Sequence, residues 1–227
     1  MKICVIIPSH NESCAISGLI KEINTHRLPV IVVDDGSTDA TVECARRAGA
    51  TTLSNERNLG KGASLMRGFD YAVEKGYDAV LTMDGDGQHL PADIPAFLAA
   101  AHQHSDGPKS FGIVMGNRMA RVGSMPVARV LTNRFMSWLI SIICKQNIPD
   151  TQCGFRLINS AILRVVKLHT RKFEAESEIL IKASRLGYTI SSVPIKTIYE
   201  KEVSHINPLI DTLRFIRFLV KHGKTKQ

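Results

Sequence analysis

Met83-Asp84-Gly85-Asp86-Gly87-Gln88-His89 is the stretch around which the chain is organised. It follows the apolar run 79–83, which predicts a buried strand that ends abruptly in Gly and Asp. Side chains two residues apart in a strand point to the same side, so we expect Asp84 and Asp86 to face one spot. Such a pair of carboxylates suits a hard divalent cation that keeps part of its coordination shell for phosphate oxygens. A polar turn at the end of a strand explains the same residues equally well.

The alternation of strand and helix patterns in the first half predicts where this stretch lies. Near-continuous apolar strands separated by helices predict a parallel sheet covered on both faces, in which ligands bind beyond the carboxyl ends of the strands. Polar clusters at 9–12, 34–37 and 84–88 all follow such ends, which favours one shared site over separate turns. The predicted strands are 2–7, 30–33, 50–53 and 79–83, and helical periodicity covers 12–25, the segment around 42–45, and 65–73.

The second half contains two apolar segments that the regular pattern does not explain. The run 126–144 has Arg129 and Arg134 as its only charged residues. The tail 208–222 predicts a basic amphipathic helix, which could lie in a membrane interface, pack on its own domain or contact a partner subunit. The other predicted elements are a helix beginning near Pro91, a strand at 110–115, a short strand after the loop 150–156, a helix at 176–185 and a strand at 190–195.

The composition favours a globular protein with anionic partners. The chain has 227 residues, 44% of them hydrophobic and 22% charged, which is enough for a sizeable core. Its formal net charge of +8 favours nucleotide phosphates, nucleic acid or an anionic membrane surface as partners. The basic residues are dispersed and no nucleic-acid-reading motif occurs, so we expect no nucleic acid partner.

The cysteines and the N-terminus predict a location. Five cysteines are scattered without metal-type spacing, which is typical of free thiols in a reducing compartment. A strand begins at once, so we expect no signal peptide, and we expect no run long enough to span a bilayer. These features predict a cytoplasmic protein, either soluble or bound to the inner face of the cell membrane.

Six motifs, taken in order, resemble a family-two glycosyltransferase of the GT-A fold, and in particular the dolichyl- and polyprenyl-phosphate sugar synthases. Any one of these motifs alone is weak, but the ordered set is highly specific. The chain departs from many relatives at Cys153, where they place Ser. The motifs are Ile6-Ile7-Pro8-Ser9-His10-Asn11-Glu12, Val32-Val33-Asp34-Asp35-Gly36-Ser37-Thr38-Asp39, Asn58-Leu59-Gly60-Lys61-Gly62, Asp84-Gly85-Asp86-Gly87-Gln88-His89, Gly116-Asn117-Arg118 and Asp150-Thr151-Gln152-Cys153-Gly154-Phe155-Arg156.

The resemblance implies one GT-A domain over residues 1–227, an α/β fold with a mostly parallel central sheet flanked by helices. A Rossmann-like nucleotide-sugar-binding half would cover 1–118 and an acceptor half 119–207. The amphipathic helix 208–222 would follow them.

The resemblance also implies a UDP- or GDP-linked sugar donor and a Mg²⁺ or Mn²⁺ cofactor. Asp35 would hydrogen-bond the base, Asp84 would lie near the ribose, and Asp86 would bind the metal with Gln88 close to it. Lys61 and Arg118 could support the phosphates, although a solvated cation at a helix start explains Lys61 equally well. The full set of expected donor-binding residues is Pro8, His10, Glu12, Val33, Asp34, Asp35, Lys61, Asp84, Gly85 and Arg118.

The implied enzyme is a metal-dependent, inverting hexosyltransferase whose acceptor is a polyprenyl phosphate at the cytoplasmic membrane face. A phosphate oxygen is already ionised near neutral pH, so catalysis would be mostly positioning and electrostatics. Basic side chains should hold that phosphate, and Asp86 and Arg156 are expected to act in catalysis. A hydroxyl acceptor would instead need a general base, for which Asp150 is the candidate, unless it only caps its loop. The expected phosphate ligands are Arg129, Arg134 and Arg156, with Ser204 and His205 as further acceptor-side candidates.

Two other interpretations stay open. One is a soluble glycosyltransferase whose acceptor is a glycan, protein or small-molecule hydroxyl. The other is a nucleotidyltransferase or a non-catalytic nucleotide-binding module, which usually has a Gly-rich, Arg-containing segment where this chain has Pro8-Ser9-His10-Asn11-Glu12. The sugar, the choice between UDP and GDP, and the oligomeric state are not predicted.

Overall fold

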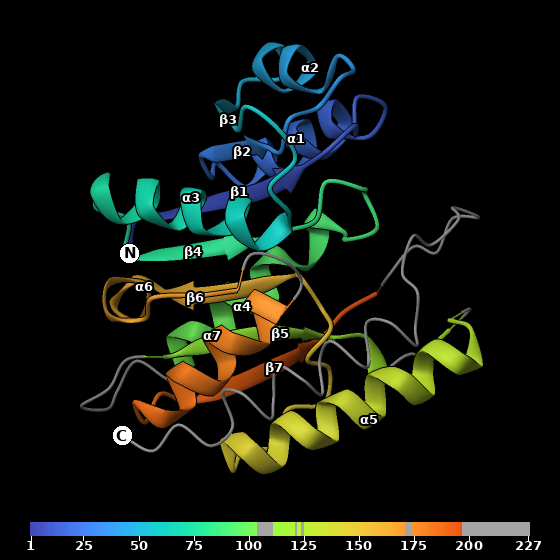
Figure 1. The fold of residues 1–227 in the computed structure, drawn as a ribbon, viewed down its shortest axis with the longest axis vertical. Helices are drawn as coiled ribbons and strands as arrows, with labels where there is room; N and C mark the ends of the chain where they lie inside the picture. The colour runs from blue at the N-terminus through green and yellow to red at the C-terminus, as the bar shows by residue number, and fades with distance from the viewer. Residues whose placement is uncertain (104–110, 121, 124, 171–173, 197–227) are drawn as a thin grey trace.

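A seven-stranded sheet with strand order β3-β2-β1-β4-β6-β5-β7 forms the centre of the fold (Figure 1). The computed structural model describes residues 1–103, 111–120, 122–123, 125–170 and 174–196. β6 pairs antiparallel with both of its neighbours, and the other pairs are parallel, so the expected mostly parallel α/β sheet is confirmed. The strands are β1 Ile3–Ser9, β2 Val30–Asp34, β3 Thr51–Ser54, β4 Ala79–Thr82, β5 Ile113–Asn117, β6 Arg156–Asn159 and β7 Ile190–Pro194.

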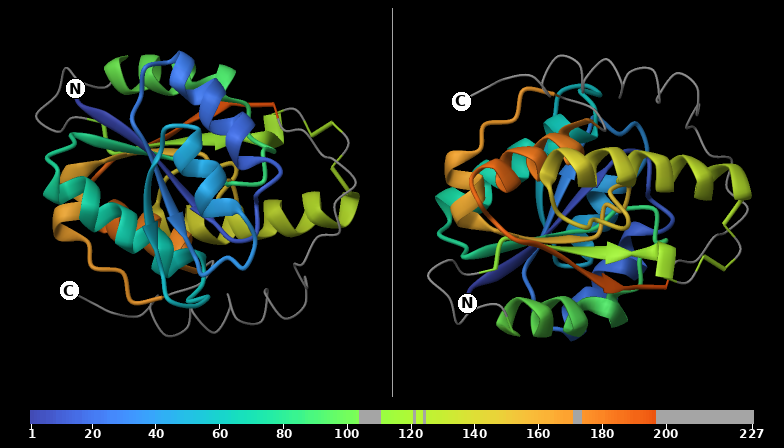
Figure 2. Two further views of the ribbon diagram at one scale, coloured as in Figure 1. Left: turned by 90° about the horizontal axis from the view of Figure 1, so that it is seen from above. Right: turned by 90° about the horizontal axis from the view of Figure 1, so that it is seen from below.

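Helices cover both faces of the sheet (Figure 2). Alternate side chains of β1 enter two different cores: Ile6 packs with Leu65 and Met136, whereas Ile7 packs in the other core with Ile16 and Phe97. This two-residue alternation is why the strand is apolar throughout. The helices are α1 Ile16–Thr25, α2 Thr41–Arg47, α3 Lys61–Glu74, α4 Ile94–Gln103, α5 Val127–Cys144, α6 Ser160–Val165 and α7 Glu174–Arg185, with short 3-10 turns η1 Pro91–Asp93 and η2 Arg118–Ala120.

The first helix begins later than predicted. The helical pattern predicts a start near Glu12, but α1 begins at Ile16. The backbone N–H of Glu12 donates to Thr41 Oγ1 and that of Ser13 donates to Asp39 Oδ2, so these groups fasten the segment to the neighbouring loop. The motif after β1 is therefore a turn, at the same edge of the sheet as the end of β2.

The expectation that no segment is long enough to span a bilayer is corrected by α5. Among the described residues, α5 is the one helix whose length and composition would suffice to cross a membrane. One third of its 18 residues are buried inside the protein, so it is also a packed element of this fold. The predicted helix 208–222, with Ser204 and His205, lies outside the described residues.

Candidate active site

Asp35 is fixed at the carboxyl end of β2 by three donors. Its Oδ1 accepts from Asn55 Nδ2 at 2.8 Å and from the backbone N–H of Leu59 at 3.0 Å, and its Oδ2 accepts from Gly60 N at 2.8 Å. Burial alone would raise the pKa of Asp35, but these hydrogen bonds outweigh it and lower the pKa below its usual value. The carboxylate is therefore ionised, and it holds the loop before α3 against the end of β2.

The other expected donor-side residues of the first two motifs surround Asp35. His10 is exposed, and its Nδ1 lies 3.0 Å from the backbone carbonyl oxygen of Asp35. Asp34 is buried and accepts a hydrogen bond from Ser37 N at 3.2 Å. Pro8 and Val33 face each other across β1 and β2 and are both buried. These two residues shape the sheet edge through their backbone, while His10 and the half-buried Glu12 present side chains there.

Asp84 is the centre of a charged network at the end of β4. Lys61 Nζ lies 2.6 Å from Asp84 Oδ1 and 3.1 Å from Glu176 Oε1. His89 Nδ1 accepts from the backbone N–H of Asp84 at 3.3 Å, and its ring lies against Phe155 with a centroid separation of 5.3 Å. Lys61, expected near the donor phosphates, thus joins two carboxylates, one from each half of the chain.

Burial and ion pairing set the charges of this network. Burial lowers the pKa of His89 to about 4, so its imidazole is neutral and the acceptor Nδ1 requires the proton on Nε2. Burial also opposes the charges of Lys61 and Asp84, but their mutual attraction outweighs it. The pKa of Lys61 is therefore raised and that of Asp84 lowered. The network holds one fixed cation between two carboxylates.

Asp86 and Gln88 form the part of this stretch that could hold a metal. Both residues are half-buried, and Asp86 Oδ1 accepts from the backbone N–H of Gln88 at 3.0 Å, which fixes the carboxylate in the turn. Within the part of the chain that the structure describes, no three His, Cys, Asp or Glu side chains cluster as metal ligands. A carboxylate and an amide oxygen nonetheless fit Mg²⁺, which is commonly held by one or two carboxylates together with substrate phosphates and water.

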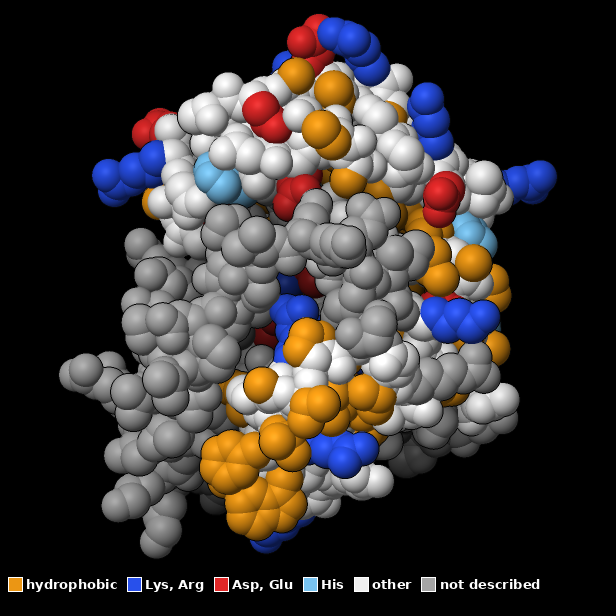
Figure 3. All heavy atoms as spheres, turned by 90° about the vertical axis from the view of Figure 1, so that its right-hand side faces the viewer, with side chains coloured by type: hydrophobic (Ala, Val, Ile, Leu, Met, Phe, Trp, Pro, Cys, Tyr) orange, Lys and Arg blue, Asp and Glu red, His pale blue; other side chains and the backbone are white. Residues whose placement is uncertain are grey.

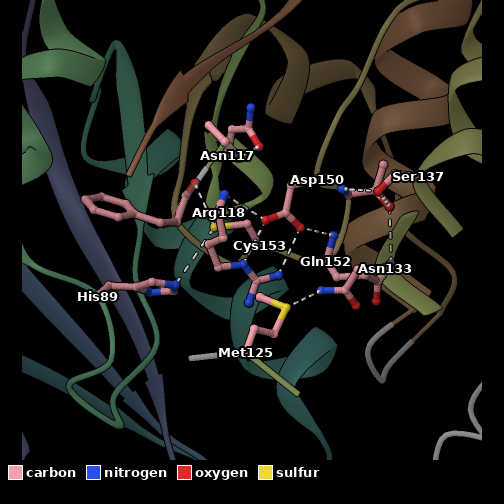
Figure 4. A network of polar contacts seen from close by, with 12 residues as sticks. His89, Asn117, Arg118, Met125, Asn133, Ser137, Asp150, Gln152 and Cys153 are labelled. Carbon is pink, nitrogen blue, oxygen red and sulfur yellow. Dashed lines mark hydrogen bonds and ion pairs between the residues drawn. The ribbon is translucent and has the colours of Figure 1, made fainter. Parts of the chain in front are cut away.

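Arg118 and Asp150 form a buried, bidentate ion pair (Figure 4). Arg118 Nε donates to Asp150 Oδ2 at 2.8 Å, and Nη2 donates to Oδ1 at 2.9 Å. The backbone N–H of Arg118 and that of Gln152 donate to the same carboxylate, at 3.0 and 3.3 Å. Both oxygens of Asp150 are thus engaged, and only 1% of the residue is exposed. These contacts suit a structural partner of Arg118 better than a base that takes a proton from an acceptor.

The three expected acceptor-phosphate residues lie in different surroundings. Arg156 is 2% exposed, and its guanidinium donates to the backbone carbonyls of Cys153, Thr151 and Glu176 at 2.6 to 2.8 Å. Its contacts therefore stabilise the fold around the 150–156 loop. Arg129 and Arg134 lie on α5, where Arg134 is exposed.

Two residues of this region are absent from the sequence-based set. Glu176 contacts Lys61, but an acidic residue in the first turn of a helix is ordinarily explained by the helix dipole. Ser9 ends β1, and its buried hydroxyl has no hydrogen-bond partner among the described residues. Ser9 could have been identified from the sequence because it is a polar residue at the carboxyl end of a predicted strand, directly before His10.

The amino-acid sequence matches a known protein family. The family model described as "Glycosyl transferase family 2" matches residues 4–166. The chain belongs to glycosyl transferase family 2. A UDP-N-acetylglucosamine–dolichyl-phosphate N-acetylglucosaminyltransferase of Methanococcus voltae is 30% identical over 98% of this chain and 97% of its own length. An undecaprenyl-phosphate mannosyltransferase of Micrococcus luteus is 28% identical, over 89% of this chain and 86% of its own length.

Solved structures of two other enzymes share the fold of this glycosyltransferase. Mannosyl-3-phosphoglycerate synthase from Rubrobacter xylanophilus matches all of this chain and 76% of its own, with a TM-score of 0.77 and 20% identity. Glucosyl-3-phosphoglycerate synthase from Mycobacterium tuberculosis matches all of this chain and 82% of its own, with a TM-score of 0.74 and 21% identity. The Mycobacterium enzyme has also been crystallised with Mn²⁺ and UDP. The GT-A fold is thereby confirmed.

Gly154 lies directly against the carboxylate of Asp84 in this glycosyltransferase. A Cβ at this position would lie 2.6 Å from Asp84 Oδ2 and 2.7 Å from Oδ1, so Gly154→Ala must displace a carboxylate that Lys61 holds in place. We expect kcat/KM for the donor to fall about 10²-fold, as a misplacement near 1 Å can cost that much. The matched control is Gly18→Ala on α1, where a Cβ meets nothing within 4 Å. Equal activity of the two variants in a steady-state assay would contradict the placement of Asp84 in the site.

Proposed function

We propose that this glycosyltransferase moves a hexose from a UDP- or GDP-linked donor to a polyprenyl phosphate at the cytoplasmic face of the membrane, with inversion at the anomeric carbon. The observation that carries the proposal is the Arg118–Asp150 pair. A hydroxyl acceptor needs a base, and both oxygens of the candidate base already accept hydrogen bonds from Arg118. A phosphate acceptor needs no such base. The named activities of the Methanococcus and Micrococcus relatives support the same acceptor class.

The donor would bind at the carboxyl ends of β1, β2 and β4. His10 and Glu12 would line the nucleoside, with Asp35 fixing the loop around it. The hydroxyl of Ser9, buried without a partner among the described residues, lies on the strand next to this edge and suits a polar group of the donor. Asp84, oriented by Lys61, would accept from a donor hydroxyl, which is consistent with its lowered pKa.

Asp86 and Gln88 would hold the Mg²⁺ or Mn²⁺ beside the diphosphate. When bound, such an ion neutralises the charge that develops on the leaving nucleoside diphosphate. Asp86 is already fixed by the backbone of Gln88, so little ordering would be needed on binding.

The acceptor phosphate would attack from the opposite side of the sugar ring. Arg129 and Arg134 are the expected residues that hold it, because Arg156 donates its hydrogen bonds to backbone carbonyls. Arg118, held by Asp150, would contribute a fixed positive charge near the leaving diphosphate. Direct displacement by an ionised oxygen depends on positioning and electrostatics, and it inverts the anomeric centre.

Transfer assays with labelled donors test the proposal. Purified protein is incubated with UDP- and GDP-linked sugars, each with a short-chain polyprenyl phosphate, a simple glycan or 3-phosphoglycerate. We expect one donor to yield a lipid-linked product whose anomeric configuration, read by NMR, is inverted. Calorimetry with UDP and GDP, with and without Mg²⁺, identifies which nucleobase the donor carries.

The competing function is transfer to a small-molecule acceptor, as the name of the Mycobacterium synthase suggests for that enzyme. Product with 3-phosphoglycerate or a glycan, and none with the lipid phosphate under any donor, would overturn the lipid assignment. A retained anomeric configuration would overturn the direct displacement.

A further inference from the structure

Helix α5 exposes a continuous apolar stripe. Its five members are among the nine large hydrophobic side chains that are exposed in the described part of the chain. At 100° per residue they fall within about 80° of one another, on the side opposite the buried Met136, Ile140 and Cys144. We call this set the α5 stripe: Val127 (73% exposed), Leu131 (62%), Phe135 (46%), Trp138 (57%) and Ile142 (56%).

Such a stripe is unusual on the outer face of a helix. A surface helix normally turns its apolar residues inward and its polar residues to solvent. α5 has an apolar outer face while its inner face carries the buried polar residues Asn133 and Ser137. Large exposed apolar patches mark interaction surfaces. Figure 3 shows hydrophobic side chains gathered in the lower part of one face of the molecule, with basic side chains beside them.

The charges around the stripe indicate what it contacts. The segment 127–144 contains no acidic residue, and its charged residues are Arg129 and Arg134. Arg134 is exposed, and the exposed Lys145 follows the last turn. A second copy of this chain would bring two positively charged helices together, whereas an anionic lipid surface complements them. The rings of Phe135 and Trp138 lie 6.1 Å apart, and aromatic side chains of this kind favour the membrane–water interface.

We infer that the α5 stripe docks on the headgroup region of an anionic lipid bilayer, with the helix lying in the interface plane. An 18-residue helix is about 27 Å long, so the stripe offers an extended contact. The inner face of α5 touches the candidate site: Ser137 Oγ accepts from the backbone N–H of Thr151 at 2.9 Å, directly after Asp150. Docking would therefore place the acceptor side of the site next to the bilayer. The proposed lipid acceptor would explain why the enzyme docks on a membrane. Docking itself depends on the α5 stripe and the basic residues beside it, and not on the identity of the acceptor.

Trp138 is the sole tryptophan, so its fluorescence reports on the α5 stripe directly. The full chain is titrated with vesicles of phosphatidylcholine containing phosphatidylglycerol, and with phosphatidylcholine alone. With the anionic vesicles we expect emission to shift to shorter wavelengths and to be quenched by lipids brominated on the acyl chains. Raising the salt concentration should weaken binding, because it screens the charges of Arg134 and Lys145.

Variants locate the contact. The double change Leu131→Ser/Phe135→Ser retains Trp138 and should lower vesicle affinity about tenfold or more, since it removes two exposed apolar side chains that docking would bury in the bilayer. The matched control is Val165→Ser/Leu186→Ser, which removes side chains of 60% and 47% exposure outside α5 and should bind as wild type.

Three results would overturn the inference. The first is Trp138 emission that vesicles do not change. The second is vesicle affinity that the stripe variants leave intact, which would locate the contact elsewhere in the chain. The third is a dimer in sedimentation that the stripe variants convert to monomer, which would assign the stripe to a second copy. Transfer to a soluble short-chain acceptor is measured in parallel: its absence with vesicle binding intact would refute the proposed function and leave this inference standing.

Discussion

Asp86→Ala is expected to reduce kcat/KM for sugar transfer by about 10²- to 10³-fold while the protein remains folded. Asp86 is the carboxylate proposed to hold the metal, and it lies half-buried in a turn, outside both cores. Its loss therefore removes charge stabilisation from the leaving diphosphate with little effect on packing. Chelation of divalent cations should reduce wild-type activity to a similar extent.

Binding measurements separate this role from a general loss of structure. By calorimetry, Mg²⁺ should tighten binding of the nucleoside diphosphate to wild-type protein, and Asp86→Ala should lose that increment while keeping the metal-free affinity. Asp70→Ala, an exposed change on α3, serves as the control and should retain both. Full activity of Asp86→Ala, or full wild-type activity in excess chelator, would refute the metal-binding role.

Asp150→Ala is expected to lower the free energy of unfolding by about 3–5 kcal/mol. It would remove the carboxylate that forms a bidentate ion pair with the guanidinium of Arg118, which is 9% exposed. The double variant Arg118→Met/Asp150→Leu should recover much of this loss, because both members of the buried ion pair are then replaced by apolar side chains. Denaturant titrations of the single and double variants measure the coupling.

The alternative role for Asp150 gives a different pattern. As a general base for a hydroxyl acceptor, its conservative change Asp150→Asn would produce a stable enzyme whose transfer rate falls about 10²- to 10⁴-fold. If Asp150 is instead a structural partner of Arg118, Asp150→Asn should lower the stability of the protein but leave measurable transfer at temperatures where the variant is folded. Glu43→Ala, which breaks the exposed pair with Arg47 on α2, is the control and should leave the unfolding midpoint unchanged.

The sheet and the polar clusters at its edge were predictable because each rests on local patterns. The strands before Ser9 and Asp34 are apolar at every position, the strand before Asp84 is apolar except at Thr82, and parallel strands bring their carboxyl ends to one edge. The family resemblance and the GT-A fold followed from motifs that sit at those ends. Both are confirmed by the family comparison and by the solved structures.

The partners of the charged side chains were not predictable, because they depend on long-range contacts. Lys61 and Glu176 are far apart in sequence, yet they share one ion pair across the two halves of the chain. The pattern around Arg156 is equally compatible with a phosphate ligand and with a buried structural cation, and only its three backbone acceptors distinguish them. The α5 stripe was missed because an apolar run such as 126–144 predicts a buried helix until the exposure of each side is known.

The antiparallel strand β6 has a consequence for how this family can diversify. β5 and β6 are neighbours of opposite direction, so the chain leaves the sheet after Asn117 and returns to the same edge at Arg156. The whole intervening segment, α5 included, is therefore the connection of one long hairpin. Such an excursion can change length or sequence without altering the order of the strands. The proposed function implies that acceptor choice is carried largely by this segment, and chimaeras that swap residues 119–149 between relatives should change the acceptor.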